Sequence, residues 1–374
     1  MRIAVITSPF LELPPVAIGA VEKLFYLLAK EWVRLGHRVS FVCCGGGDDP
    51  SIEFVRIKKF CRTGSLKKDI ILDFFYSLRA LWRCPRADVL VCNTFWTPAL
   101  APFFKWKYKK LIFGVHRFPK GQFWLYPFVN AFICVSSAVA DELRRQIGNK
   151  PNIFVINNPI DTAVFFRREE ETTDSGNYTV VFAGRVHPEK GLDLLFEAAE
   201  LAVSANSRLG LKLKIIGTTD IKRGGGGGEY VQRLVRLAPH VRVEWVDPIS
   251  DPLKLAETIR SGDCFVYPSV ATKGETFGVA PLEAMALGLP TVLTNLPCFN
   301  DFVEPKVNAL QVEIGENCAA SIKGAILYLM ANPKEAMKLS ESASNTAKRF
   351  SPQVTANKYV ECFNELLDRE ADER

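Results

Sequence analysis

The chain has 374 residues, of which 48% are hydrophobic and 24% are charged, so its composition is that of a folded globular protein rather than a disordered one. This length exceeds one ordinary hydrophobic core and indicates two domains. No apolar run approaches the roughly 20 residues that span a bilayer, and no Cys-x-x-Cys pair suggests a zinc site. The N-terminal strand-like segment is too short for a signal peptide, so we expect a cytoplasmic protein with reduced thiols.

Charge is distributed unevenly along the chain. Residues 1–160 carry 23 Lys and Arg against 11 Asp and Glu, or +12, and the remainder carries 24 against 30, or −6. A basic half joined to an acidic half indicates that the basic half faces something anionic.

The chain begins with a strand–loop–helix–strand unit. Residues 3–7 read as a buried strand, residues 21–35 as an amphipathic helix and residues 38–44 as the next strand, which predicts a parallel sheet. The loop before the helix lacks the G-x-G-x-x-G pattern of dinucleotide-binding proteins. Its Gly19 either lets the backbone approach a ligand or merely starts the helix tightly.

Three further buried strands, at 87–94, 110–116 and 130–137, each end in polar residues. The carboxyl ends of parallel strands meet at one edge of a sheet, so these residues should cluster on one rim. The candidates on the acceptor side of a site are Asn93, Thr94, His116 and Arg117. His116 could act in catalysis or could be a structural hydrogen-bonding residue, and the sequence favours neither.

Aromatic and basic residues alternate at 103–110 and 117–128. This pattern suits a membrane interface that carries anionic lipids. A nucleic-acid surface and a solvated basic face with its aromatics in the core are the alternatives. We favour membrane contact and expect no nucleic-acid partner.

The polar segment 168–177 marks a domain boundary, and a second strand–helix unit follows it. Arg185 and Lys190 lie five positions apart in the loop between this strand and helix, where they would clamp a diphosphate or would be ordinary surface cations. The five-glycine run at 224–228 reads as flexible filler or a lid. The tail 352–367 is helical and is expected to cross back to the first domain.

Residues 272–294 predict a loop, a helix and a buried strand. The loop presents backbone N–H groups at a helix N-terminus, a site that favours anions. Glu275 and Glu283 flank it, and carboxylates accept hydrogen bonds from vicinal hydroxyls. A nucleotide-sugar would fit this arrangement, although a surface glutamate near a helix start is the plainer alternative. No Asp-x-Asp occurs to hold a metal, so Arg185 and Lys190 would replace a cation and we expect no metal site.

Together these segments carry a resemblance to a known family. AIGAVEKLFYLLAKEWVRLGH, VSSAVADEL, NNPID, FAGRVHPEKG and ETFGVAPLEAMALGLP resemble, in this order, the family 4 glycosyltransferases of GT-B fold. The resemblance implies an α/β protein with two Rossmann-like, doubly wound parallel-sheet domains that face a central cleft. The acceptor domain would comprise residues 1–165 and a crossover helix at 352–374, and the donor domain residues 178–351.

The resemblance also implies roles for residues. Arg185 and Lys190 would bind the diphosphate, and Glu275 would hold the transferred sugar. The remaining donor contacts would come from Gly19, the amides of Phe277, Gly278 and Val279, and the ribose-binding Glu283. His116 would face the sugar or the acceptor, and residues 245–247 would lie near the base. The sequence departs from the family pattern at Gly19-Ala20, where Gly-Gly is usual, and at Asn158-Pro159, where Asn-Gly is usual.

The implied function is metal-independent, retaining transfer of a hexose from a UDP-sugar, glucose first, to a saccharide acceptor. The basic half favours a lipid-linked acceptor, in exopolysaccharide or envelope glycan assembly, and a peripheral position on the inner face of the membrane. No cofactor is expected beyond the UDP-sugar donor substrate. A sugar-nucleotide epimerase of the same fold and a non-catalytic nucleotide-sugar-binding protein are the alternatives.

Overall fold

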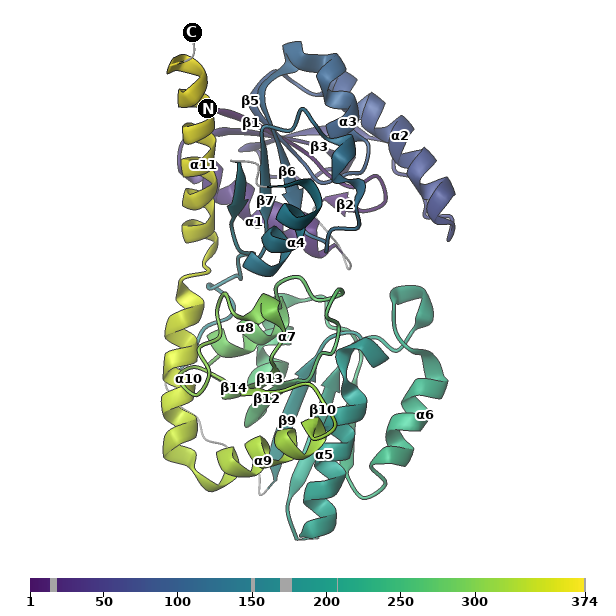
Figure 1. The fold of residues 1–374 in the computed structure, drawn as a ribbon, viewed down its shortest axis with the longest axis vertical. Helices are drawn as coiled ribbons and strands as arrows, with labels where there is room; N and C mark the ends of the chain where they lie inside the picture. The colour runs from purple at the N-terminus through teal and green to yellow at the C-terminus, as the bar shows by residue number, and fades with distance from the viewer. Residues whose placement is uncertain (14–18, 149–151, 169–176, 207, 373–374) are drawn as a thin grey trace. The chain divides into compact units, whose positions relative to one another are not determined.

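The computed structural model describes residues 1–13, 19–148, 152–168, 177–206 and 208–372, which form two compact units (Figure 1). Unit 1 comprises Met1–Pro159 and Pro352–Arg374, and unit 2 comprises Ile160–Ser351. Residues 169–176 of the expected linker lie outside the described residues.

Unit 1 is built on an eight-stranded, all-parallel sheet in the order β2-β3-β1-β5-β6-β7-β8, with β4 paired to β3. Its strands are β1 (Arg2–Ile6), β2 (Glu12–Leu13), β3 (Arg38–Gly45), β4 (Ile52–Ile57), β5 (Ala87–Cys92), β6 (Tyr108–Val115), β7 (Ala131–Cys134) and β8 (Ile153–Val155). The central strands are continuous apolar runs because helices cover both faces of a parallel sheet. The strand order reverses between β1 and β5, where such sheets place their ligands.

Two helices of unit 1, at 20–34 and at the C-terminus, were predicted from the sequence, and the structure adds several others. The helices of unit 1 are α1 (Ala20–Arg34), α2 (Leu66–Arg83), α3 (Thr97–Leu100), η1 (Ala101–Lys107), η2 (Gln122–Leu125), α4 (Ser137–Ile147) and α11 (Pro352–Asp372). The C-terminal α11 packs on α1, where the rings of Trp32 and Tyr359 lie 5.6 Å apart and edge-on. The tail is therefore part of the core of unit 1.

Unit 2 contains a six-stranded parallel sheet in the order β11-β10-β9-β12-β13-β14. Its strands are β9 (Tyr178–Ala183), β10 (Leu211–Ile216), β11 (Arg242–Val246), β12 (Cys264–Tyr267), β13 (Thr291–Thr294) and β14 (Leu310–Val312). This is the Rossmann order, with its switch point between β9 and β12. Both halves are thus doubly wound α/β domains, as predicted.

The helices of unit 2 are η3 (Pro188–Lys190), α5 (Leu192–Ala205), η4 (Ile221–Arg223), α6 (Gly227–Leu237), α7 (Pro252–Arg260), α8 (Val279–Ala286), η5 (Pro297–Phe299), α9 (Cys318–Ala331) and α10 (Pro333–Lys348). The predicted stop of α8 at Gly288 is a Schellman cap, since Gly288 N–H donates to Met285 O and Leu289 N–H to Ala284 O. In the described part of the chain, no helix is long and apolar enough to cross a membrane.

The segment 160–165, which we assigned to the first domain, belongs to unit 2 in this division. Ile160 N–H donates to Phe350 O at 2.9 Å, just beyond the end of α10. Phe165 is buried to 1% exposure. Packing against α10 therefore decides where this part of the chain belongs.

Candidate active site

Three donors converge on one oxygen of Glu275, in the loop that follows β12. Lys190 Nζ lies 2.6 Å from Glu275 Oε2, and the hydroxyls of Tyr267 and Ser269 each donate to the same oxygen at 3.1 Å. The side chains of Lys190 and Glu275 are only 9% and 11% exposed. Burial, followed by the charge of Glu275, raises the pKa of Tyr267 well above its usual range, so its phenol keeps the proton that it donates.

Close backbone packing brings Lys190 to Glu275 across 85 residues of sequence. Gly191 has a left-handed φ of +67°, and a Cβ there would lie 1.9 Å from the carbonyl oxygen of Pro268. Val270 N–H donates to Glu189 O at 3.0 Å, which joins the same two loops. The residue after Lys190 therefore has to be glycine for the ends of β9 and β12 to meet in this way.

Arg185 follows β9 at the same edge of the sheet. Its guanidinium pairs with the Glu189 carboxylate and donates to Gly224 O at 3.0 Å. The glycine run itself is held by backbone hydrogen bonds, because Gly226 N–H donates to Val186 O at 2.7 Å and Gly225 N–H to Asp220 O at 2.8 Å. Residues 224–226 therefore form a hydrogen-bonded turn beside Arg185, and Gly227 begins α6, whereas the composition predicted flexible filler or a lid.

The start of α8 has the predicted loop-to-helix geometry. Gly278 precedes the helix with φ +97°, and a Cβ there would lie 2.5 Å from the ring of Phe299. The Phe277 side chain is 1% exposed and contacts the rings of Phe302 and Phe350, so only its backbone could meet a ligand. Val279 opens α8, and Glu283 lies one turn further along it, half-buried.

His116 follows β6 in unit 1, with both ring nitrogens enclosed. Its ring meets that of Phe25 edge-on, with the ring centroids 5.2 Å apart. Burial lowers the pKa of His116 to about 4. The imidazole is therefore neutral near pH 7 and suits hydrogen bonding rather than proton donation from a cation.

The other acceptor-side residues lie at the carboxyl ends of neighbouring strands β5 and β6, as predicted. The Thr94 hydroxyl donates to the Thr97 hydroxyl at 2.5 Å, and both side chains are buried. The Thr94 proton is therefore used within the α3 turn. Asn93 is half-buried, and Arg117 is exposed. Gly19 precedes α1 with φ +146°, a conformation that favours glycine and is compatible with either role.

Glu22, in the first turn of α1, was not among the residues predicted from the sequence. Its side chain is 3% exposed, and burial raises its pKa against the opposing charges of Arg117 and Arg62. A buried carboxyl group that interacts electrostatically with the acceptor-side Arg117 is a candidate functional residue. The only signal in the sequence was its place three residues after Gly19, which a helix-start glutamate explains equally well.

We expect His116→Gln to make the free energy of unfolding less dependent on pH between pH 6.5 and pH 4. The folded-state pKa of His116 is about 4, below its ordinary 6.5, so its contribution to stability is present above pH 6.5 and lost as the pH falls through 4. The wild type should lose roughly 3 kcal/mol more than the variant across this window. Urea unfolding of both proteins at several pH values measures this, and a pH-independent difference would contradict it.

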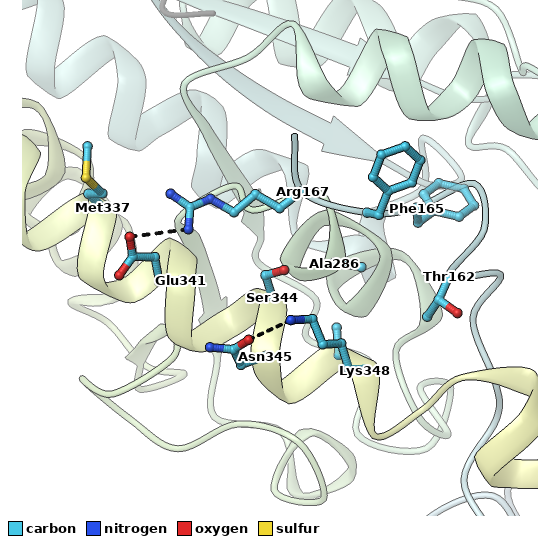
Figure 2. Close-up of a pocket in the computed structure, with 11 residues that line it drawn as sticks. Thr162, Phe165, Arg167, Ala286, Met337, Glu341, Ser344, Asn345 and Lys348 are labelled. Carbon is cyan, nitrogen blue, oxygen red and sulfur yellow. Dashed lines mark hydrogen bonds and ion pairs between the residues drawn. The ribbon is translucent and has the colours of Figure 1, made fainter. Parts of the chain in front are cut away.

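A separate cavity of about 890 Å³ lies elsewhere in unit 2. It is lined by α10, by residues 162–167 and by Ala286, at the end of α8 remote from Glu275 in sequence. Figure 2 shows Arg167 directed to Glu341 and Lys348 to Asn345. No predicted donor residue lines it, so it is not the donor site predicted from the sequence.

Among the described residues, no group of three or more His, Cys, Asp or Glu is arranged to hold a metal ion.

Two family models match the chain in sequence order. The description "Glycosyltransferase Family 4" matches residues 21–164, and "Glycosyl transferases group 1" matches residues 165–346. Similar curated proteins include D-inositol 3-phosphate glycosyltransferases from Pseudarthrobacter chlorophenolicus, 29% identical over 63% of this chain and 56% of the relative, and from Rhodococcus erythropolis, 27% identical over 51% and 42%. The chain thus spans about half the length of these relatives.

Solved structures share the fold over nearly the whole chain. Sucrose-phosphate synthase from Thermosynechococcus elongatus superposes with a TM-score of 0.78 at 17% identity, covering 99% of this chain and 100% of that one. HepE from Anabaena, in complex with UDP and glucose, superposes with a TM-score of 0.73 at 19% identity, covering 98% and 100%.

Proposed function

The chain belongs to the family 4 glycosyltransferases of GT-B fold, and we propose that it transfers a hexose from a UDP-sugar to a saccharide acceptor. The observation that carries this proposal is the buried cluster of Lys190, Tyr267 and Ser269 around Glu275, at the switch point of the unit 2 sheet. Glucose is the first sugar to test, because HepE is described with UDP-glucose.

The geometry supports different residues for the sugar end and the diphosphate end of the donor substrate. The hydrogen-bond donors Lys190, Tyr267 and Ser269 all reach Glu275 Oε2. We therefore assign the other carboxylate oxygen, Oε1, to a sugar hydroxyl. An ammonium has three N–H donors, and Lys190 directs one of them to Glu275, so the others are assigned to the diphosphate. Arg185 supplies the second cation that neutralises charge on the leaving UDP.

The proposed reaction retains configuration. The bond between the sugar and the phosphate breaks, the acceptor hydroxyl adds to the same face, and the departing phosphate takes the hydroxyl proton. The enzyme's residues would then orient and neutralise without forming a covalent intermediate. Determining the anomeric configuration of the product by NMR tests this, and an inverted product would contradict it.

The acceptor is proposed to be a lipid-linked saccharide in exopolysaccharide or envelope glycan assembly. The support is the positive charge of the first half of the chain, +12 over residues 1–160. The curated relatives are named for transfer to D-inositol 3-phosphate, so a phosphorylated polyol belongs among the acceptors tested. Activity would take place at the inner membrane surface, without a metal or another cofactor.

Nucleotide binding is the first expected result. In EDTA, UDP and one UDP-sugar should stabilise the protein by about 2.7 kcal/mol at 100 times their dissociation constant. A thermal-shift series with UDP, GDP, ADP, NAD and UDP-sugars measures this. Glu283→Ala and Arg185→Ala should abolish the response, whereas the exposed Glu316→Ala should keep it. If no nucleotide raises the melting temperature, or if only NAD does, the proposed donor is overturned.

Product analysis separates the alternatives. A transferase releases UDP when acceptor is added and hydrolyses the donor only slowly without it. An epimerase would convert one UDP-sugar into another with no acceptor present. Binding without either reaction would indicate a non-catalytic protein.

A further inference from the structure

Helix α2 carries an apolar stripe that faces solvent. Ile71, Phe75, Leu78 and Trp82 recur at i, i+4, i+7 and i+11, a spacing that places them on one side of a helix. Their exposed fractions are 56%, 58%, 41% and 70%. The opposite side, with Asp73, Tyr76, Ser77 and Ala80, is the one buried in unit 1. The exposed stripe is therefore not needed for the core.

The neighbouring segment η1 also exposes apolar side chains. Lys107 Nζ donates to the carbonyl oxygens of Trp82 at 3.1 Å and Cys84 at 2.8 Å, which holds η1 against the end of α2. On η1, Phe103 and Trp106 are 72% and 62% exposed. We call the stripe, together with these two residues, the α2–η1 face; α2 lies along the outer edge of unit 1 in Figure 1.

Cations border this face. The exposed basic residues of α2 and η1 are Lys67, Lys68, Arg79, Arg83 and Lys105. The two carboxylates of α2 are engaged locally: Asp69 accepts from Thr63, and the buried Asp73 accepts from Trp96 N–H. An apolar stripe with a basic border is complementary to a surface that is negatively charged and apolar beneath.

We propose that the α2–η1 face docks on an anionic lipid surface. Phe, Trp, Leu and Ile side chains would enter the headgroup boundary, while Lys and Arg stems cover apolar surface and keep their charges in the headgroup layer. A second copy of this chain fits poorly, because two identical basic borders would repel across a two-fold interface. Docking would bring unit 1 to a lipid-linked acceptor, and only this consequence of the inference rests on the proposed function.

The test is flotation of the full chain with vesicles of phosphatidylcholine alone and of equimolar phosphatidylcholine and phosphatidylglycerol. The wild type should float with the anionic vesicles and detach in high salt. Phe75→Ser/Trp82→Ser should lower vesicle affinity at least tenfold. Lys67→Gln should lower it about fivefold, the effect of one cation near the surface. Leu253→Ser/Val307→Ser, which removes two similarly exposed apolar side chains from unit 2, should float as the wild type does.

Slow hydrolysis of the UDP-sugar in solution is measured for every variant. The inference is overturned if the wild type does not float, if Phe75→Ser/Trp82→Ser floats equally well, or if this variant instead dissolves a dimer seen by light scattering. Loss of flotation with unchanged donor hydrolysis and unchanged thermal stability supports the inference. If the wild type floats but neither binds nor hydrolyses a UDP-sugar, the proposed function is refuted, whereas the inference that the α2–η1 face docks on lipid still holds.

Discussion

Glu275→Gln is expected to reduce sugar transfer about a thousandfold, the upper range for removing one preorganised polar group from a transition state. The amide has nearly the same shape as the carboxylate but no charge. It leaves the Lys190 ammonium, 9% exposed, without its anionic partner at 2.6 Å. Lys190 would then shift away from the position from which it neutralises the leaving diphosphate.

Steady-state release of UDP with saturating donor measures this effect. Glu316→Gln, an exposed glutamate of unit 2, is the matched control and should keep wild-type activity. Thermal unfolding of both variants tells lost chemistry from lost folding. If Glu275→Gln stayed folded and retained transfer within threefold, Glu275 would not hold the reacting sugar, and the donor site would have to be rebuilt around other residues.

Gly191→Ala is expected to destabilise unit 2 by about 3–5 kcal/mol, at the upper end for a single substitution. The new methyl group would lie 1.9 Å from the Pro268 carbonyl oxygen, and the backbone there has a φ of +67° that L side chains rarely adopt. Relief requires the loops after β9 and β12 to separate. That movement would also carry Lys190 away from Glu275, so binding of UDP-sugar should fall together with stability.

Gly324→Ala is the control for this substitution. Gly324 is an interior residue of α9, and a Cβ there would meet nothing within 4 Å. Alanine should therefore stabilise the helix by up to about 1 kcal/mol. Differential scanning calorimetry compares the two variants with the wild type. Equal melting temperatures for Gly191→Ala and the wild type would show that the contact between the two loops does not hold the site together.

Strands and helices were predictable because their signals are local. The strands at 3–6 and 131–135 are unbroken apolar runs, because helices cover both faces of the parallel sheet that buries them. The end of α8 was predictable from Gly288, since only glycine adopts the left-handed cap without cost. The absence of a dinucleotide glycine pattern and of Asp-x-Asp also narrowed the expected ligand to a nucleotide-sugar held without a metal.

The features that the sequence did not reveal have a common physical origin, which is packing between segments distant in sequence. The glycine run at 224–228 looks flexible by composition, yet hydrogen bonds to Val186 and Asp220 hold its first part as a turn and its last two residues begin α6. Glu22 looks like a solvated helix-start residue, and only the fold buries its side chain. Helix α2 has apolar residues on two sides, and only its packing in unit 1 decides which side is buried.

The sequence by itself determined the fold class and a short set of candidate residues, because periodicity, caps and turn residues act over a few positions. It also indicated family membership through motifs in a fixed order. Only the tertiary structure decided that Lys190, Tyr267 and Ser269 converge on a single oxygen of Glu275. That convergence depends on β9 and β12 being hydrogen-bonded neighbours, 85 residues apart for the Lys190–Glu275 pair. Strand order is set by the packing of the whole sheet, and no local pattern carries it.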